Sequence, residues 1–221
     1  MIALINPGHG NLESVEAAFA RVGMPAVITG DPSAIDDADA VVLPGDGAFH
    51  EAMADLERLG LLPALRRAVD GRRPFLGICL GYQLLFSASE EFREGRGLDV
   101  IPGVVRRFPP GPRVPHMGWN RVWHGGALQL FEGVPDGAHF YFVHSYFPVV
   151  GAAATPASTA GGLAGARGSD ALRQAWCEYG VRFAAAIERG KIYAAQFHPE
   201  KSQQWGKRLL ENFAAIVKES R

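Results

Sequence analysis

The sequence contains few cysteines, no long apolar run and almost no net charge. Its 221 residues include 2 cysteines, Cys79 and Cys177, which are too few for a disulfide framework and form no Cys-x-x-Cys motif. The formal net charge of -1 gives no overall basic field for nucleic acid or an anionic membrane. No stretch reaches membrane-spanning length, and residues 1–6 lack a basic leader, so we expect a cytoplasmic protein without membrane or nucleic-acid partners.

Metal-binding and nucleotide-binding motifs are missing too. None of the 7 histidines stands in a His-x3-His spacing, and their surroundings are apolar or rich in glycine. Neither the full dinucleotide fingerprint nor a P-loop lysine follows the first apolar run. The sequence therefore predicts no metal site and no cofactor.

Apolar runs of strand length alternate with segments of helical period, the pattern of a mainly parallel central sheet flanked by helices. With 48% hydrophobic residues, the chain can bury one sizeable core, so we expect a single α/β domain over residues 1–221. Strands are predicted at 2–5, 40–43, 74–78, 104–108, 128–131, 140–143, 183–188 and 192–197. Helices are predicted at 12–22, 49–58, 61–69, 80–87 and 205–217.

Two segments interrupt this alternation. Residues 102–115 hold 5 prolines and 2 glycines, which predicts an irregular path on the surface. Residues from about 152 to 173 begin with a stretch built mainly of Ala, Gly, Ser and Thr, which predicts a flexible insertion. That insertion is either a surface excursion or an added contact to a partner.

A cysteine stands between two glycines at the end of an apolar run. The strand and the helix predicted on either side place Cys79 at a strand-to-helix turn, where the helix N-terminus favours a thiolate. Gly77 and Gly81 allow a sharp turn and a close substrate approach, and the Leu80 N–H is expected to point to where an oxyanion forms. A small core cysteine is the alternative, and the glycines disfavour it. We interpret Cys177, which has no such surroundings, as structural.

A histidine and a carboxylate stand two residues apart near the end of the last predicted strand. In extended chain, His198 and Glu200 leave on the same face, so the carboxylate can orient the imidazole. The alternative is a histidine that only makes structural hydrogen bonds. Combined with Cys79, the pair supplies a nucleophile, a base and a group that orients the base, which indicates acyl transfer through a thioester.

The segments around these residues resemble the class I glutamine amidotransferases and, more narrowly, the family of glutaminase subunits of imidazole glycerol phosphate synthase. The resemblance implies a protein that hydrolyses glutamine to glutamate and ammonia and passes the ammonia to a cyclase subunit, as a heterodimer in histidine biosynthesis. Alternatives are a related glutaminase that serves a different synthase, a γ-glutamyl peptidase, or a catalytically impaired subunit that only binds its partner. The matching segments are 10–15, 43–45, 47–49, 79–86, 115–120, 141–146 and 196–202.

The resemblance also implies a role for each matching residue. The nucleophile, the base and the residue that orients the base are Cys79, His198 and Glu200. The oxyanion hole is formed by Leu80 and the turn of Gly45, Asp46 and Gly47. Glutamine is bound by Gln83, Glu91, Ser145 and Tyr146, with Glu91 suited to the α-ammonium group. The partner interface contains His116, Met117, Trp119 and Asn120, with Trp119 as its anchor.

The chain departs from the family pattern beside the proposed site. Asn6-Pro7 stands where the family usually has Asp-Tyr, so a carboxylate and one N–H are lost. Asp46 stands where the family usually has a small aliphatic residue. A carboxylate at the oxyanion site would oppose developing negative charge, so we expect the Asp46 side chain to point away from Cys79.

Overall fold

A seven-stranded sheet forms the centre of the molecule in the computed structural model, which describes residues 1–8, 10–70, 73–92, 95–151 and 171–220. The strand order is β11-β12-β13-β4-β3-β1-β2, with β13 to β2 parallel and β11 and β12 antiparallel at one edge. The strands are β1 (Ile2–Ile5), β2 (Ala26–Thr29), β3 (Ala40–Leu43), β4 (Phe75–Ile78), β11 (Arg173–Tyr179), β12 (Val181–Arg189) and β13 (Ile192–Ala195). The predicted α/β class with a mainly parallel sheet is confirmed.

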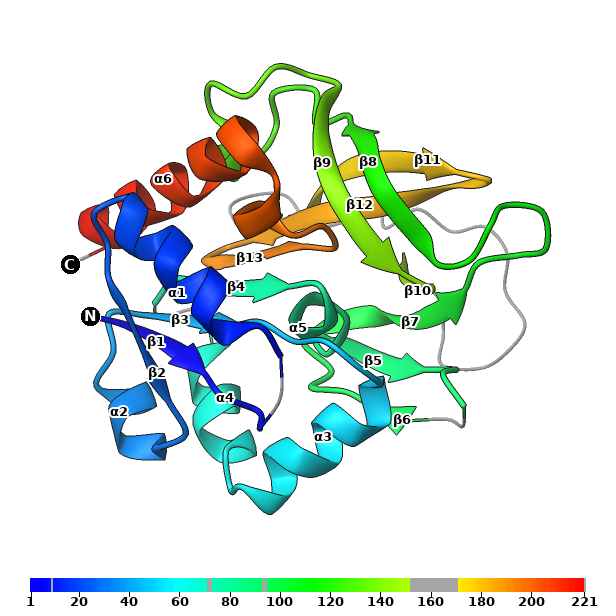
Figure 1. The fold of residues 1–221 in the computed structure, drawn as a ribbon. Coiled ribbons are helices and arrows are strands. Elements are labelled where there is room, and N and C mark those ends of the chain that lie inside the picture. The colour runs from blue at the N-terminus through cyan, green and yellow to red at the C-terminus, as the bar shows by residue number, and fades with distance from the viewer. Residues whose placement is uncertain (9, 71–72, 93–94, 152–170, 221) are drawn as a thin grey trace.

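Helices cover both faces of this sheet, which explains its continuous apolar strands. In β1, Ile2 and Leu4 pack on one face, and Ala3 and Ile5 pack on the other. The first face is covered by α1 (Leu12–Arg21) and α6 (Gln203–Glu219), and the second by α2 (Pro32–Asp36), α3 (Phe49–Arg58) and α4 (Leu62–Ala68) (Figure 1). None of the helices in the described part of the chain is both long and apolar enough to cross a membrane.

Two smaller sheets extend the molecule beyond the central one. The first has the order β10-β7-β5-β6, and the second pairs β8 with β9 in antiparallel fashion (Figure 1). Backbone hydrogen bonds between Trp123 and Trp176 join the end of β8 to β11. The remaining elements are β5 (Phe86–Ser89), β6 (Gly95–Arg96), β7 (Ile101–Arg107), β8 (His116–Val122), β9 (Ala138–His144), β10 (Tyr146–Val150), α5 (Leu80–Gln83) and the 3-10 helices η1 (Gln129–Phe131) and η2 (Pro199–Lys201).

Three local predictions are wrong. The helix expected at 80–87 ends at Gln83, because the chain then enters β5 and pairs with β7. Residues 129–131 form η1 instead of a strand, since the buried Glu188 carboxylate accepts the N–H groups of Gln129 and Leu130 at 3.0 and 2.6 Å. The first part of segment 102–115 belongs to β7, a central strand, because most of its prolines lie after the strand ends. Of the expected insertion at 152–173, residues 152–170 lie outside the described part.

Candidate active site

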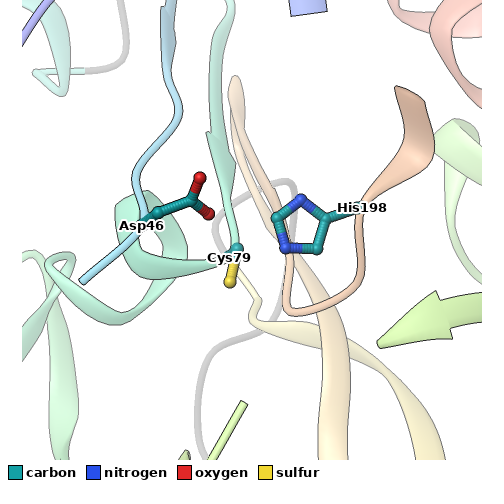
Figure 2. Close-up of side chains that lie close together, drawn as sticks. All are labelled: Asp46, Cys79 and His198. Carbon is teal, nitrogen blue, oxygen red and sulfur yellow. The ribbon is translucent and has the colours of Figure 1, made fainter. Parts of the chain in front are cut away.

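Three strands of the central sheet deliver side chains to one place at their carboxyl ends, where open α/β sheets bind their ligands. Asp46 follows β3, Cys79 follows β4 and His198 follows β13. One carboxylate oxygen, the Sγ atom and one ring nitrogen of these residues lie within 4.8 Å of one another. The expected meeting of Cys79 with His198 is therefore confirmed (Figure 2).

Cys79 occupies a sharp turn between β4 and α5, as predicted. Its backbone angles are φ 55° and ψ −108°, a conformation that L residues rarely adopt, and Cys79 is buried at the edge of the cleft. A Cβ on Gly81 would lie 1.8 Å from the Leu43 carbonyl oxygen, and one on Gly77 would lie 2.9 Å from the Gly81 carbonyl oxygen. The two glycines thus let three backbone segments pack closely beneath the thiol.

The imidazole of His198 is oriented by Glu200. Nδ1 lies 2.8 Å from Oε1 of Glu200, and both side chains are almost fully buried. Burial lowers the pKa of His198, but the Cys79 thiolate and the Glu200 carboxylate outweigh it and raise the pKa to about 10. Nε2 is buried without a hydrogen-bond partner among the described residues, which leaves it for the thiol. The predicted orientation of the base is confirmed.

Strand β9 and the start of η2 hold the backbone of His198. Its N–H donates to the Tyr141 carbonyl at 2.9 Å, and its carbonyl accepts the Ser202 hydroxyl at 2.6 Å. Ser202 Oγ also accepts the Tyr141 N–H at 3.0 Å. The base is therefore fixed to the strand opposite β8.

The prediction that Asp46 points away from Cys79 is wrong. Its carboxylate is directed toward the space between Cys79 and His198 (Figure 2). The Asn11 N–H donates to Asp46 Oδ2 at 3.3 Å, so the start of α1 draws the side chain inward. This contact connects two distant segments, which explains why the turn sequence alone did not reveal it.

The expected oxyanion donor is occupied in this conformation. The Leu80 N–H donates to the Gly45 carbonyl oxygen at 3.3 Å. The prediction that this N–H is directed to the space where an oxyanion forms is therefore wrong for this conformation. Gly47 adopts φ 95°, so the turn depends on a glycine conformation. An oxyanion can bind Leu80 only after the Gly45 carbonyl leaves.

A cleft of about 460 Å³ opens beside Cys79. It brings together the residues that were expected to bind glutamine, which come from three separate segments of the chain. Its lining includes Asp46, Gly47, Cys79, Leu80, Gln83, Glu91, Pro115, Val143, His144, Ser145, Tyr146 and Lys201. His144 and Lys201 were not assigned to the site, although both lie inside segments that carried the family resemblance.

A chain of side-chain amides connects the cleft wall to the thiol. Gln83 Nε2 donates to the Tyr146 carbonyl at 2.9 Å and to Gln196 Oε1 at 3.0 Å. Gln196 Nε2 in turn lies 3.8 Å from Cys79 Sγ. Sequence reasoning did not single out Gln196, whose position two residues before His198 was its only signal. The amides fix the floor of the cleft.

Glu91 reaches the cleft from the loop after β5. One of its carboxylate oxygens accepts the Phe49 N–H at 2.7 Å, at the first residue of α3. Ala48, the residue before that helix, offers no side-chain cap, so Glu91 satisfies an otherwise orphaned donor. Glu91 lies 42 residues after Phe49 in the sequence, and this hydrogen bond holds its carboxylate at the cleft.

The expected partner surface is only partly exposed. Met117 and Trp119 on β8 are 63% and 45% exposed, and Trp119 packs edge-on against Tyr141 of β9. His116 is 2% exposed and stacks on Phe142, and burial lowers its pKa to about 4. Alternate residues of β8 face inward, so the side chain of His116 is not exposed on the expected partner surface in this conformation.

A thiol on a strained strand-to-helix turn, a buried imidazole held by a carboxylate and an adjoining cleft define a cysteine-dependent acyl-transfer enzyme. A family model described as "Glutamine amidotransferase class-I" matches residues 4–217. The chain belongs to the class-I glutamine amidotransferase family.

Named relatives are similar over nearly the whole chain. The imidazole glycerol phosphate synthase subunit HisH of Moorella thermoacetica is 46% identical over 217 residues, which cover 98% of this chain and 95% of the relative. The subunit of the same name from Methanothermobacter thermautotrophicus is 46% identical over 218 residues, which cover 99% of this chain and 100% of the relative.

Solved structures support the fold. A crystal structure described as that of a glutamine amidotransferase aligns with a TM-score of 0.70 at 19% identity, covering 99% of this chain and 100% of that chain. The glutaminase domain of Trypanosoma brucei CTPS, solved with bound acivicin, aligns with a TM-score of 0.62 at 16% identity, covering 99% of this chain and 93% of that chain.

Proposed function

We propose that this protein hydrolyses glutamine to glutamate and ammonia and delivers the ammonia to the cyclase subunit of imidazole glycerol phosphate synthase, in a cytoplasmic heterodimer. The observation that carries the proposal is the arrangement of Cys79, His198 and Glu200 at a strained turn that opens on the cleft. The identity to relatives named as HisH subunits supports the choice of synthase.

Cleavage of glutamine proceeds through a thioester. The Cys79 thiolate attacks the side-chain amide carbon, and the C=O electrons move to oxygen. As this tetrahedral species collapses, the C–N bond breaks and protonated His198 gives its proton to the leaving ammonia. His198 then takes a proton from water, whose oxygen attacks the thioester carbon. The C–S bond breaks, glutamate leaves and the thiolate is regenerated.

The cleft residues position the substrate. The second carboxylate oxygen of Glu91 binds the α-ammonium group of glutamine, which is a charge-assisted contact. Gln83 places its amide oxygen toward the substrate, because its N–H groups are held by the Tyr146 carbonyl and Gln196. Ser145 and Tyr146 complete the wall. These assignments follow from the residues that line the cleft beside Cys79.

The oxyanion hole forms only after a rearrangement of the turn. Rotation of the peptide between Gly45 and Asp46 withdraws the carbonyl that accepts the Leu80 N–H and turns the Asp46 N–H toward the site. Two backbone donors then face the oxyanion, an arrangement that stabilises the transition state by several kcal/mol in related chemistry. We expect the partner with its ligand to favour this state, so that the free subunit is a slow glutaminase.

The decisive experiment separates glutamine cleavage from synthesis. The protein is purified with its cyclase partner, and glutamate release and imidazole glycerol phosphate formation are both measured. Cys79→Ala is expected to abolish synthesis from glutamine and to leave synthesis from added ammonia intact. Loss of both reactions in a complex that still assembles would refute the proposed division of labour.

A further inference from the structure

Asp46, Cys79 and His198 present three different donor atoms to one point. A carboxylate oxygen, a sulfur and a ring nitrogen lie within 4.8 Å of one another, and no other group of three or more such residues is found in the described part of the chain (Figure 2). The proposed mechanism uses the thiol and the imidazole but has no role for the carboxylate. The position of Asp46 therefore calls for a separate explanation.

These donors match the ligand preference of zinc. Zn²⁺ binds thiolate sulfur at about 2.3 Å and imidazole nitrogen or carboxylate oxygen at about 2.0–2.2 Å in tetrahedral geometry, which sets the donor atoms roughly 3.3–3.6 Å apart. The observed spacing of up to 4.8 Å requires a contraction of up to roughly 1.2–1.5 Å. Mg²⁺ and Ca²⁺ prefer sets made only of oxygen donors, so they fit this group poorly.

The imidazole is already held as a zinc-binding histidine is held. Nδ1 of His198 is engaged by the Glu200 carboxylate at 2.8 Å, as in carboxylate–histidine–zinc triads. Nε2 is buried without a partner among the described residues, and the His198 residue is only 4% exposed. An unsatisfied buried nitrogen costs free energy that a bound ion recovers. Geometry around the histidine thus favours a ligand at Nε2.

Asp46 is the donor that can move. It lies on the turn after β3, is partly exposed, and its carboxylate is held by a 3.3 Å hydrogen bond from the Asn11 N–H. Cys79 is fixed by its strained turn, and His198 is fixed by its backbone contacts to β9 and Ser202. A rotation of the Asp46 side chain shortens its distances to the other two donors, and small rotations of the Cys79 and His198 side chains bring Sγ and Nε2 together.

We propose that Cys79 Sγ, His198 Nε2 and the Asp46 carboxylate bind one Zn²⁺, with a water from the cleft as fourth ligand, and that the ion blocks the nucleophile. The ion binds the deprotonated thiol and imidazole, so binding releases to solvent any proton that they carry, and nothing is oxidised or reduced. Coordinated sulfur cannot attack an amide, and coordinated Nε2 cannot transfer a proton. The inhibition rests on the proposed glutaminase function, whereas the binding does not.

Zinc affinity is measured on the purified full chain by competition with a chromophoric chelator. We expect one ion per chain, a loss of affinity of at least about tenfold in Asp46→Asn and in Cys79→Ser, and a loss of about 10–100-fold in Glu200→Gln. Cys177→Ser and His139→Gln are matched controls that should bind as the unaltered chain does. Thermal unfolding of each variant shows that it is folded.

Equal affinity, within about twofold, of Asp46→Asn and the unaltered chain would overturn the proposed site. Undiminished binding in Cys79→Ser would assign the ion to an adventitious surface position and would overturn it too. These outcomes depend on no enzymatic activity, so they test the site even if the proposed function is wrong.

Inhibition is tested separately on the complex with the cyclase partner. Added zinc should suppress glutamate release with a midpoint near the measured dissociation constant, a chelator should restore the rate, and Asp46→Asn should need at least about tenfold more zinc. Full activity with one ion bound per chain would overturn the inhibitory claim. Absence of glutamate release before zinc is added would instead contradict the proposed function.

Discussion

At the scale of single residues, the charge of Asp46 opposes the negative charge that the proposed reaction creates. The carboxylate, Cys79 Sγ and a His198 nitrogen lie within 4.8 Å of one another, and the imidazolium already has Glu200 as a partner. A second negative charge at this distance therefore disfavours the thiolate and the oxyanion more than it helps the imidazolium. We therefore expect the Asp46 carboxylate to slow the proposed reaction, whether or not a metal is present.

We therefore expect Asp46→Asn to raise kcat/KM for glutamate release, measured on the complex, by about 3- to 10-fold. Removing one nearby like charge changes an ionisation equilibrium by up to about one pKa unit, which is a factor of ten. Glutamate release is measured in chelator-treated buffer, so that loss of zinc binding does not contribute. An unchanged or lower kcat/KM in a variant of normal stability would show that the carboxylate assists the reaction.

Burial, Cys79 and Glu200 together set the pH range of the base. Burial alone lowers the pKa of His198, and the charges of Cys79 and Glu200 raise it to about 10, above the ordinary 6.5. Protonated His198 thus contributes stability that is complete below about pH 6.5 and is lost as the pH rises through about 10.

Glu200→Gln should lower the His198 pKa, because a neutral amide stabilises imidazolium less than a carboxylate does. The alkaline limb of the pH profile of kcat/KM is expected to move to lower pH, and kcat at pH 7 should fall by about 10²-fold or more, as when a base loses its orienting group. Alkylation of Cys79 by iodoacetamide, followed against pH, gives an independent profile. An alkaline limb that does not move would contradict the role of Glu200.

The sequence predicted the identity of these residues but not every orientation. Cys79 could be predicted because it follows a buried strand, and His198 because it comes shortly after β13. Glu200 was paired with His198 correctly, but through the turn of η2 and not through the strand alternation that was expected. Asp46 could not be placed, because its direction depends on the Asn11 N–H, 35 residues away in the chain. The prediction that the Leu80 N–H is free was also wrong. That N–H donates to the carbonyl oxygen of Gly45, which lies in another segment of the chain.

At the scale of elements, the turn between β4 and α5 works only if its neighbours approach closely. Gly81→Ala would place a methyl group 1.8 Å from the Leu43 carbonyl oxygen, a backbone atom of β3 that cannot move without shifting the strand. We expect a loss of about 3 kcal/mol in the free energy of unfolding, the upper part of the usual range for overpacking.

Urea denaturation measures this loss, with Gly30→Ala as the matched control. Gly30 has no heavy atom within 4 Å of its added Cβ, so the control should change the free energy of unfolding by less than about 1 kcal/mol. Equal midpoints for the two variants would show that the close approach of β3 to α5 does not constrain the fold.

Elements that depend on distant partners escaped prediction. The parallel strands β1, β3, β4 and β13 were found because each is fully buried and reads as a local apolar run, whereas β2, an edge strand that is only partly buried, was missed. Residues 128–131 read as such a run too, yet Glu188 and its ion pair with Arg173 hold this segment as η1. Nothing near residue 128 in the sequence signals a carboxylate 59 residues farther on.

At the scale of the whole molecule, the expected docking surface and the base share one strand pair. Trp119 of β8 stands opposite Tyr141 of β9 in the antiparallel ladder, and the Tyr141 carbonyl accepts the His198 N–H. A partner that binds Met117 and Trp119 would therefore contact β8, which pairs with β9, the strand that positions the base. This arrangement gives partner binding a short structural route to the site.

Trp119→Ala should weaken assembly with the cyclase subunit by at least about 2 kcal/mol, or roughly 30-fold in dissociation constant, because large aromatic side chains at interface centres contribute most of the binding free energy. Leu59→Ala, which removes a 37% exposed side chain at the end of α3, is the control. Affinity is measured by titration calorimetry.

Because Trp119 is 45% exposed, its loss should leave the unfolding midpoint of the free subunit nearly unchanged. Equal affinities for the two variants would show that the partner does not dock on β8. Partner binding would then have to reach His198 through elements other than β8 and β9.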